Sequence, residues 1–283
     1  MDQNLINFKI YRYHLLPLSS RSSQIKLFPD KEFSAEEIKQ RKNEFLSIEL
    51  DSLEKNKDKK HPLKLHDKED EFYLFKVAQK KDTIITKDFE SETITNEPYC
   101  FVIFNNDPKV QKIAISDNKD AFSNQDVVKN ILLKILKRDL KKYGLNIEIE
   151  ALFDTISFWK YVAKHKDQIT YINFKYIKPN LANISSSLTE DFKDFSENVN
   201  SHESNISVKA PKNGTLENIN KDNKNINGLV NYVSEGAGTI KLKAKGVRKM
   251  MDTKENPTIT TVEEIQIEGA PEQVIKIYKS IVE

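Results

Sequence analysis

The sequence predicts an α+β protein, with an N-terminal antiparallel β-rich domain followed by a mixed α/β domain. Most segments before residue 123 have strand-like patterns, whereas strands and helices alternate after residue 143. All seven glycines lie at or after Gly144, so the turns of the earlier part must rely on Asn, Asp and Pro. We therefore expect two domains, 1–143 and 144–283.

The first domain begins with a strand and a helix. Residues 5–15 alternate apolar and polar side chains, which predicts a strand, and 34–47 begin with a Ser cap and an acidic first turn, which predicts a helix. The charge-dense segment 54–70 predicts an exposed loop. Segments 71–79 and 82–89 follow as two apolar runs, and we expect them to form a hairpin.

The clearest local signals of this domain come at its end. Residues 99–116 predict two strands around an Asn-Asn-Asp-Pro turn, the first of them central because it is apolar on both faces. Residues 123–143 predict a helix that Ser123 or Asn124 can cap and that Gly144 ends. Its apolar stripe has the spacing of a buried helix face: Val127, Val128, Ile131, Leu132, Ile135, Leu136 and Leu140.

In the second domain, predicted strands and helices alternate along the chain. The strands are expected at 145–153, 169–178, 204–211, 238–246 and 258–269. The helices are expected at 155–166, 184–199, 226–235 and 270–282, the last with Pro271 at its first helical position.

Composition excludes several classes of protein. The chain has 38% hydrophobic residues with 15 Phe and 10 Tyr, so at least one packed core is expected. No apolar run is long enough to span a membrane, and the N-terminus lacks the features of a secretory signal. A single cysteine, Cys100, cannot form an intrachain disulfide, so we expect a cytoplasmic protein.

Charge is balanced overall but segregated locally. The formal net charge is +2, and 40 of the 45 basic residues are Lys. Residues 205–254 carry a local charge of +6, whereas 180–204 carry −4. Because Lys acts as a point charge toward phosphate, nucleic-acid contacts of this chain would favour the backbone over base edges. A codon bias toward Lys, Asn and Ile is the simpler explanation for the shortage of Arg.

Signals for catalysis are weak. His61 and His66 lie in a charged loop without the partners of a metal site, and Cys100 lies in an apolar run as a buried thiol would. Glu148 and Glu150 share one face of a strand and could serve a metal-dependent nuclease, as could Asp107 with Lys109. Such pairs are expected by chance in so charged a chain. No catalytic residue, metal ligand or cofactor is therefore predicted.

The turn Gly236-Ala237-Gly238 has two interpretations. It follows a helix and precedes a strand, which is typical of a helix stop with positive φ. The alternative is a pocket of backbone amides that binds an anion.

The strongest functional signal is a row of lysines. Alternation along the strand at 238–246 directs Ile240, Leu242 and Ala244 to the core, so the intervening lysines face solvent. The predicted phosphate contacts are Lys241, Lys243, Lys245, Arg248 and Lys249, helped by Lys134, Lys137, Lys141 and Lys142 of the earlier helix. The alternative is an edge strand that lysines protect from aggregation.

The second half resembles the RexA-type phage-exclusion proteins and, more loosely, KwaB of the Kiwa phage-defence system. The resemblance covers about residues 95–245 and rests on Ile177-Lys178-Pro179, the acidic helix after it, Ser204 to Ala210, and Asn231 to Gly236 with Gly238-Thr239-Ile240. It implies a cytoplasmic DNA-binding sensor, a homodimer, that acts with a membrane-protein partner encoded nearby.

We therefore expect a DNA-binding component of a bacterial anti-phage system of the abortive-infection type. A metal-dependent nuclease in the same setting is one alternative. A protein–protein interaction module that uses the apolar surface around Trp159 is another.

Overall fold

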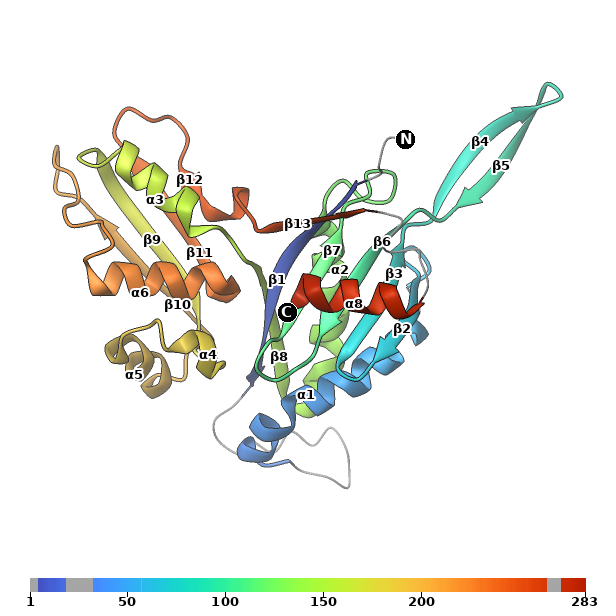
Figure 1. Cartoon of the computed structure of the whole chain (residues 1–283), viewed down its shortest axis with the longest axis horizontal. Coiled ribbons are helices and arrows are strands. Elements are labelled where there is room, and N and C mark those ends of the chain that lie inside the picture. Colours follow the sequence, from blue (N-terminus) through green and yellow to red (C-terminus); the bar gives the residue numbers. More distant parts are fainter. Residues whose placement is uncertain (1–4, 19–32, 57, 264–270) are drawn as a thin grey trace. The chain divides into compact units, whose positions relative to one another are not determined.

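The computed structural model describes residues 5–18, 33–56, 58–263 and 271–283. It confirms the α+β class, because antiparallel sheets and helices both occur and the N-terminal part is rich in strands (Figure 1). The chain forms two compact units. Unit 1 comprises Met1–Ile10, Pro17–Ile147 and Ile259–Glu283, and unit 2 comprises Tyr11–Leu16 and Glu148–Thr258. The chain enters unit 2 after Ile147, three residues beyond its first glycine, Gly144. The C-terminal segment Ile259–Glu283 belongs to unit 1 again.

A seven-stranded sheet organises unit 1, although residues 11–16 and 148–151 of two of its strands are part of unit 2. Its strands are β1 (Leu5–Pro17), β2 (Leu63–Glu69), β3 (Phe72–Ala78), β6 (Tyr99–Asn105), β7 (Lys112–Ser116), β8 (Leu145–Ala151) and β13 (Ile259–Glu263). The order is β13–β1–β7–β6–β3–β2, with β8 also paired to β1. Strand β6 is central and almost wholly buried, as its uninterrupted apolar run predicts. Residues 264–269, the end of the strand expected at 258–269, lie outside the described part.

The helices of unit 1 begin where their capping residues predict. In α1 (Ala35–Ser52), Ser34 and Glu37 form a reciprocal capping box. In α2 (Gln125–Leu140), Asn124 caps the helix, and the predicted stripe is buried at five positions from Val128 to Leu140. Gly144, at φ 70°, ends the following 3₁₀ turn Lys141–Tyr143. In α8 (Pro271–Val282), proline occupies the first position as expected.

One loop prediction and one pairing prediction are wrong. The segment 54–70, expected as an exposed loop, contains β2. Only Leu63 of this strand is buried, so its charged residues gave the sequence the appearance of a loop. The strand at 71–79 does not pair with 82–89. Instead β3 pairs with β2 and β6, while β4 (Lys81–Lys87) pairs with β5 (Glu90–Asn96) in a separate two-stranded hairpin. Asp88 and Phe89 both have positive φ, which is the two-residue turn that suits a hairpin.

Unit 2 holds a four-stranded sheet. Its strands are β9 (Ile169–Ile177), β10 (Glu203–Lys209), β11 (Gly238–Ala244) and β12 (Met251–Asp252), in the order β10–β9–β11–β12. Its helices are α3 (Thr155–Lys164), α4 (Ala182–Ser185), α5 (Glu190–Asn198) and α6 (Lys224–Tyr232). The single helix predicted at 184–199 is two helices, since Ser185 and Ser186 hydrogen-bond to preceding carbonyls and compete with helix continuation.

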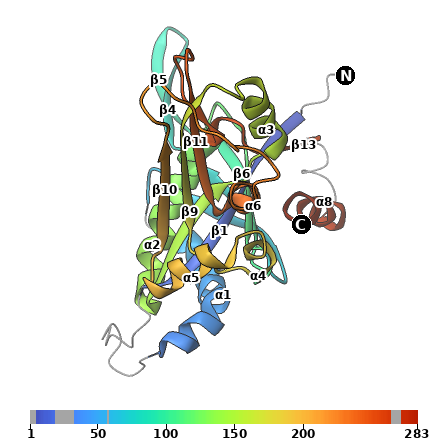
Figure 2. The ribbon, with the colours of Figure 1, turned by 90° about the vertical axis from the view of Figure 1, so that its left-hand side faces the viewer.

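Helices cover one face of this sheet. Ile172, Phe174 and Tyr176 of β9 and Ile240 and Leu242 of β11 are buried in one core with side chains of α3, α4 and α6. Figure 2 shows α3 and α6 on the same side of β9, β10 and β11. Because side chains alternate along a strand, the intervening residues point to the opposite face of the sheet.

Candidate functional site

The opposite face of the unit 2 sheet is polar, and we call it the open face. It consists of the side chains of Tyr171, Asn173 and Lys175 on β9, Glu203, Asn205, Ser207 and Lys209 on β10, and Lys241 and Lys243 on β11. Its β10 residues and Lys241 are exposed, and its β9 residues and Lys243 are half-buried. The open face is therefore accessible and carries positive side chains on all three strands.

An aromatic ring lies in the first cross-strand row of the open face. Tyr171 is the register partner of both Lys209 and Lys243, so the ring lies between two lysine positions. Lys209 Nζ lies 6.0 Å from the centre of the ring, within reach of a weak cation–π interaction. The Tyr171 hydroxyl lies 3.3 Å from Ser207 Oγ, which restrains the ring from the neighbouring strand.

The second row carries an amide and an ion pair. Asn173 Nδ2 donates to Ser207 Oγ over 2.7 Å. On the other side of Asn173, Lys241 Nζ lies 3.5 Å from Asp252 Oδ2 of the cross-strand partner on β12. Since the Lys241 side chain is 48% exposed, this is a surface pair that water and salt weaken.

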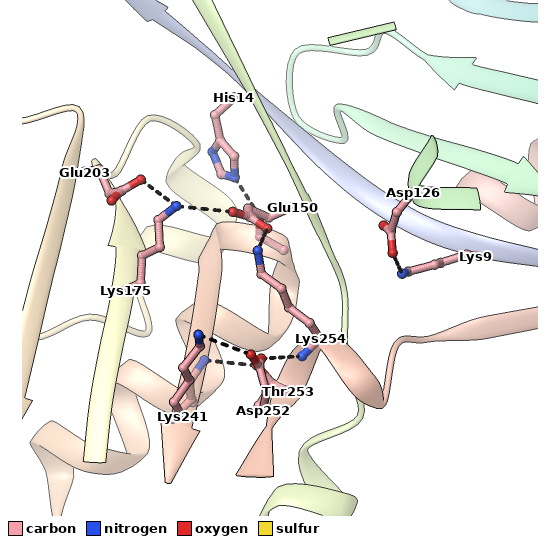
Figure 3. Close-up of polar contacts among 12 residues, drawn as sticks. Lys9, His14, Asp126, Glu150, Lys175, Glu203, Lys241, Asp252, Thr253 and Lys254 are labelled. Carbon is pink, nitrogen blue, oxygen red and sulfur yellow. Dashed lines mark hydrogen bonds and ion pairs between the residues drawn. The ribbon is translucent and has the colours of Figure 1, made fainter. Parts of the chain in front are cut away.

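Beyond the second row, lysines and glutamates form a chain of ion pairs (Figure 3). Lys175 Nζ lies 2.7 Å from Glu203 Oε2 and 3.6 Å from Glu150 Oε1, and Lys254 Nζ lies 3.5 Å from Glu150 Oε2. Partial burial opposes the charge of Lys175, but the hydrogen bond to Glu203 and the attraction of the glutamates outweigh it and raise its pKa. Lys175 therefore remains charged and is held in place.

The turn after β11, residues 245–250, is the basic loop. The half-buried Lys243 organises it, because Nζ donates to the carbonyl oxygens of Val247 and Arg248 over 2.6 and 2.7 Å. Lys249 lies 2.7 Å from Glu255. Among the described residues, exposed Lys245 and Arg248 have no ion-pair partner, so their charges are available to a ligand.

The predicted lysine row is therefore only partly a row. Ile240, Leu242 and Ala244 are buried as expected, and Lys241 and Lys243 share the open face. Lys245 follows the end of β11, past an irregularity in the pairing with β9, and belongs to the basic loop. The Lys243 ammonium group donates to backbone carbonyls of the basic loop. Lys243, which the sequence places in the centre of the row, therefore has a structural role.

The other predicted contacts belong to unit 1. Lys134 and Lys137 lie on α2, and Lys141 and Lys142 lie in the 3₁₀ turn after it. Lys142 Nζ lies 2.6 Å from the buried carboxylate of Glu49, which also accepts a hydrogen bond from Tyr143. The helix and the β11 segment are thus in different units, and we treat the unit 2 residues as the site.

Side chains considered for catalysis have structural partners. Burial, followed by the charge of Asp117, raises the pKa of Cys100 to about 12, which leaves the thiol protonated and unreactive. His61 bonds to Asp58, and Glu150 faces two ammonium groups. Within the described residues, no group of three or more His, Cys, Asp or Glu could hold a metal ion.

The glycine turn serves backbone packing. Gly236 has φ 80°, and its carbonyl accepts a hydrogen bond from Nε2 of buried His14 over 2.9 Å. A Cβ on Gly238 would lie 2.0 Å from the carbonyl oxygen of Lys175, so only glycine allows β11 to approach β9 there. These contacts account for both glycines without an anion.

Tyr171, Asn173, Lys175 and Lys209 are site residues that the sequence interpretation missed. For the three β9 residues the signal was present in the segment Ile169 to Lys178, where polar and apolar residues alternate as they do in β11. Lys209 lies in the strand predicted at 204–211. What the sequence does not contain is the register, which aligns these side chains with the lysines of a strand about 70 positions away.

No protein-family model, curated protein or solved structure matches this chain. Among the described residues, no helix has the length and apolar character required to cross a membrane.

Proposed function

We propose that this protein binds nucleic acid through the basic loop and the adjoining open face of unit 2, as the DNA-binding component of a bacterial anti-phage system. The observation that carries the proposal is the exposed Lys209 beside Tyr171 on the open face, together with the adjoining basic loop, where Lys245 and Arg248 have no ion-pair partner among the described residues. The setting in phage defence, the homodimer and the membrane-protein partner rest on the resemblance to the RexA-type proteins.

The geometry suits a contact with the phosphate backbone. Ammonium and guanidinium groups release counterions when they neutralise phosphates, and this release provides most of the affinity of sequence-tolerant binding. Within the part of the chain that the structure describes, Lys245 and Arg248 have no ion pair to break before they contact a phosphate. Lys241 and Lys249 would exchange weak surface pairs with Asp252 and Glu255 for a phosphate.

A salt titration of binding tests the proposal. Fluorescence anisotropy with a labelled 20-nucleotide DNA is measured from 50 to 300 mM salt for the wild type and for a Lys245→Glu/Arg248→Glu variant. We expect weaker binding and a slope of log affinity against log salt that falls by about 0.7–0.9 for each phosphate that the variant no longer neutralises.

A charge-matched variant provides the control. Lys160→Glu/Lys164→Glu makes the same change in net charge on α3, the helix that covers the other face of the sheet, at two exposed positions. We expect it to bind nearly as the wild type does. Equal affinities for the wild type and both variants would rule out this surface, and loss of the oligonucleotide with Mg²⁺ would favour the nuclease alternative.

A phage-infection assay tests the biological setting. Bacteria that carry this protein and its neighbouring genes are challenged with phage, and plaques are counted for the wild type and for both double variants. We expect protection to fail only in the Lys245→Glu/Arg248→Glu strain. Protection that is absent already with the wild type, or present with every variant, contradicts the defence role of this surface.

A further inference from the structure

We infer that the open face takes an unpaired nucleic-acid strand, with a base stacked on the ring of Tyr171. This inference rests on the proposed function and specifies its substrate class. The inference depends on the aromatic ring of Tyr171, which lies between the positions of Lys209 and Lys243. Cations alone would suit a duplex and a single strand equally.

The position of Tyr171 favours stacking. The ring lies on the middle strand of the three, so a ligand that crosses the sheet from β10 to β11 must pass over it. Adjacent strands are roughly 5 Å apart, so Lys209 and Lys243 flank the ring at the distance of neighbouring side chains. The hydroxyl contact with Ser207 restrains the ring before any ligand arrives, which lowers the entropic cost of stacking.

Amides next to the ring add contacts to base edges. Asn173 lies two residues after Tyr171 on the same face, and one N–H of its side-chain amide donates to Ser207 Oγ. Among the described residues its Oδ1 has no hydrogen-bond partner, so it can accept from a base. Asn205, one row further on β10, is exposed. Amide side chains pair with base edges, which in a single strand are free of Watson–Crick partners.

A duplex does not fit these groups. Its bases are already stacked on one another, so a ring on a sheet surface cannot reach a base face without unpairing it. A duplex would meet the basic loop through phosphates and leave Tyr171 and Asn173 unused. Sheets that bind single strands combine a basic margin with an aromatic platform in this way.

The experiment compares three ligands of similar charge with two substitutions at one position. Anisotropy is measured for labelled dT20, for a 20-nucleotide abasic strand and for a 20-base-pair duplex, with the wild type, Tyr171→Ala and Tyr171→Phe. Tyr171→Ala should weaken dT20 binding about 5- to 150-fold, the range for the loss of one stacked base, and leave abasic binding unchanged. Tyr171→Phe keeps the ring and should stay within about 3-fold of the wild type.

The outcomes separate this inference from the proposed function. If no ligand binds, the proposed function fails. If Lys245→Glu/Arg248→Glu weakens binding but dT20 and the abasic strand bind equally and Tyr171→Ala changes neither, only the stacking inference fails. Poly-glutamate binding as tight as dT20 would also overturn it, because charge alone would then suffice.

Two further arms complete the test. Labelled rU20 distinguishes RNA from DNA, and Tyr171-dependent binding of either strand supports the inference. Circular dichroism and thermal melting establish whether Tyr171→Ala is folded. If it is not, the wild-type preference for dT20 over the abasic strand is the independent readout, and equal binding of the two overturns the inference.

Discussion

Lys241 and Asp252 face each other across the β11–β12 ladder, with 3.5 Å between Nζ and Oδ2. Asp252 also accepts a hydrogen bond from the amide of Lys254, so it caps a short 3₁₀ helix. The pair thus holds a cation of the open face next to its own counter-charge. Under the proposed function, this ion pair competes with a phosphate for Lys241, and a substitution that keeps the cap can remove it.

Asp252→Asn should strengthen nucleic-acid binding. Asparagine caps a helix as well as aspartate, so the fold should persist while Lys241 becomes free to contact a phosphate. We expect a gain of about 2- to 10-fold in affinity at 100 mM salt and a steeper salt slope, measured by anisotropy. The Glu255→Gln variant, which releases Lys249 in the same way, should behave similarly, and weaker binding in both would contradict the assignment of this surface.

Lys243→Met should cost stability. The substitution keeps the stem but removes an ammonium group that donates to two carbonyl oxygens of the basic loop. Because the group is partly exposed, we expect a loss of about 1–2 kcal/mol in the free energy of unfolding, measured by urea denaturation. Lys245→Met, two residues along the chain and without an ion-pair partner among the described residues, should change it by less than about 0.5 kcal/mol. Equal effects would show that Lys243 does not organise the loop.

Two glycines of the same segment should respond differently to alanine. Gly238→Ala would place a Cβ 2.0 Å from the Lys175 carbonyl oxygen, so β11 and β9 would have to separate. We expect a loss of more than about 3 kcal/mol, or no folded protein. At Gly246, φ is +79° but nothing lies within 4 Å of the added Cβ, so Gly246→Ala should cost only about 1–2 kcal/mol of backbone strain. Thermal melting of the two variants measures the contrast.

Cys100 should make stability fall at alkaline pH. Burial raises its folded-state pKa from 9.0 to about 12, so between these values the unfolded thiol loses its proton and the folded thiol keeps it. The stabilisation is complete below pH 9 and is lost as the pH rises toward 12. Relative to Cys100→Ala, the wild type should lose about 1 kcal/mol of unfolding free energy between pH 9 and 10. Parallel curves for the two proteins would show that the thiol is solvated.

Local structure was predictable wherever adjacent residues determine it. Ser34, Asn124 and Pro271 begin helices as their chemistry requires, and the alternation in β11 buries Ile240 and Leu242. Pairing between distant segments was not predictable in the same way. Nothing near β3 indicates that its neighbours are β2 and β6, because the register depends on packing across the whole sheet.

The candidate site was predictable only as a list of cations. Alternation identifies Lys241 as exposed, but it cannot show that Lys243 turns back onto the carbonyls of its own loop. Nor can it show that Tyr171 and Lys209 align with the same row. These relationships depend on the three-dimensional course of the chain, and they decide which charges a ligand can reach.

The exposure of the hairpin β4–β5 has a consequence for local unfolding. Both of its strands are solvent-exposed, with Ile84 71% and Phe89 104% exposed, so its apolar side chains gain almost nothing from being folded. An isolated pair of strands is marginal in water, and this one should open many times while the seven-stranded sheet stays intact. Among the described strands, its amides should be the first to take up deuterium, and limited proteolysis should cut this hairpin before it cuts the seven-stranded sheet. The two fragments would remain together after the cut, since the sheets on which both units depend lie elsewhere.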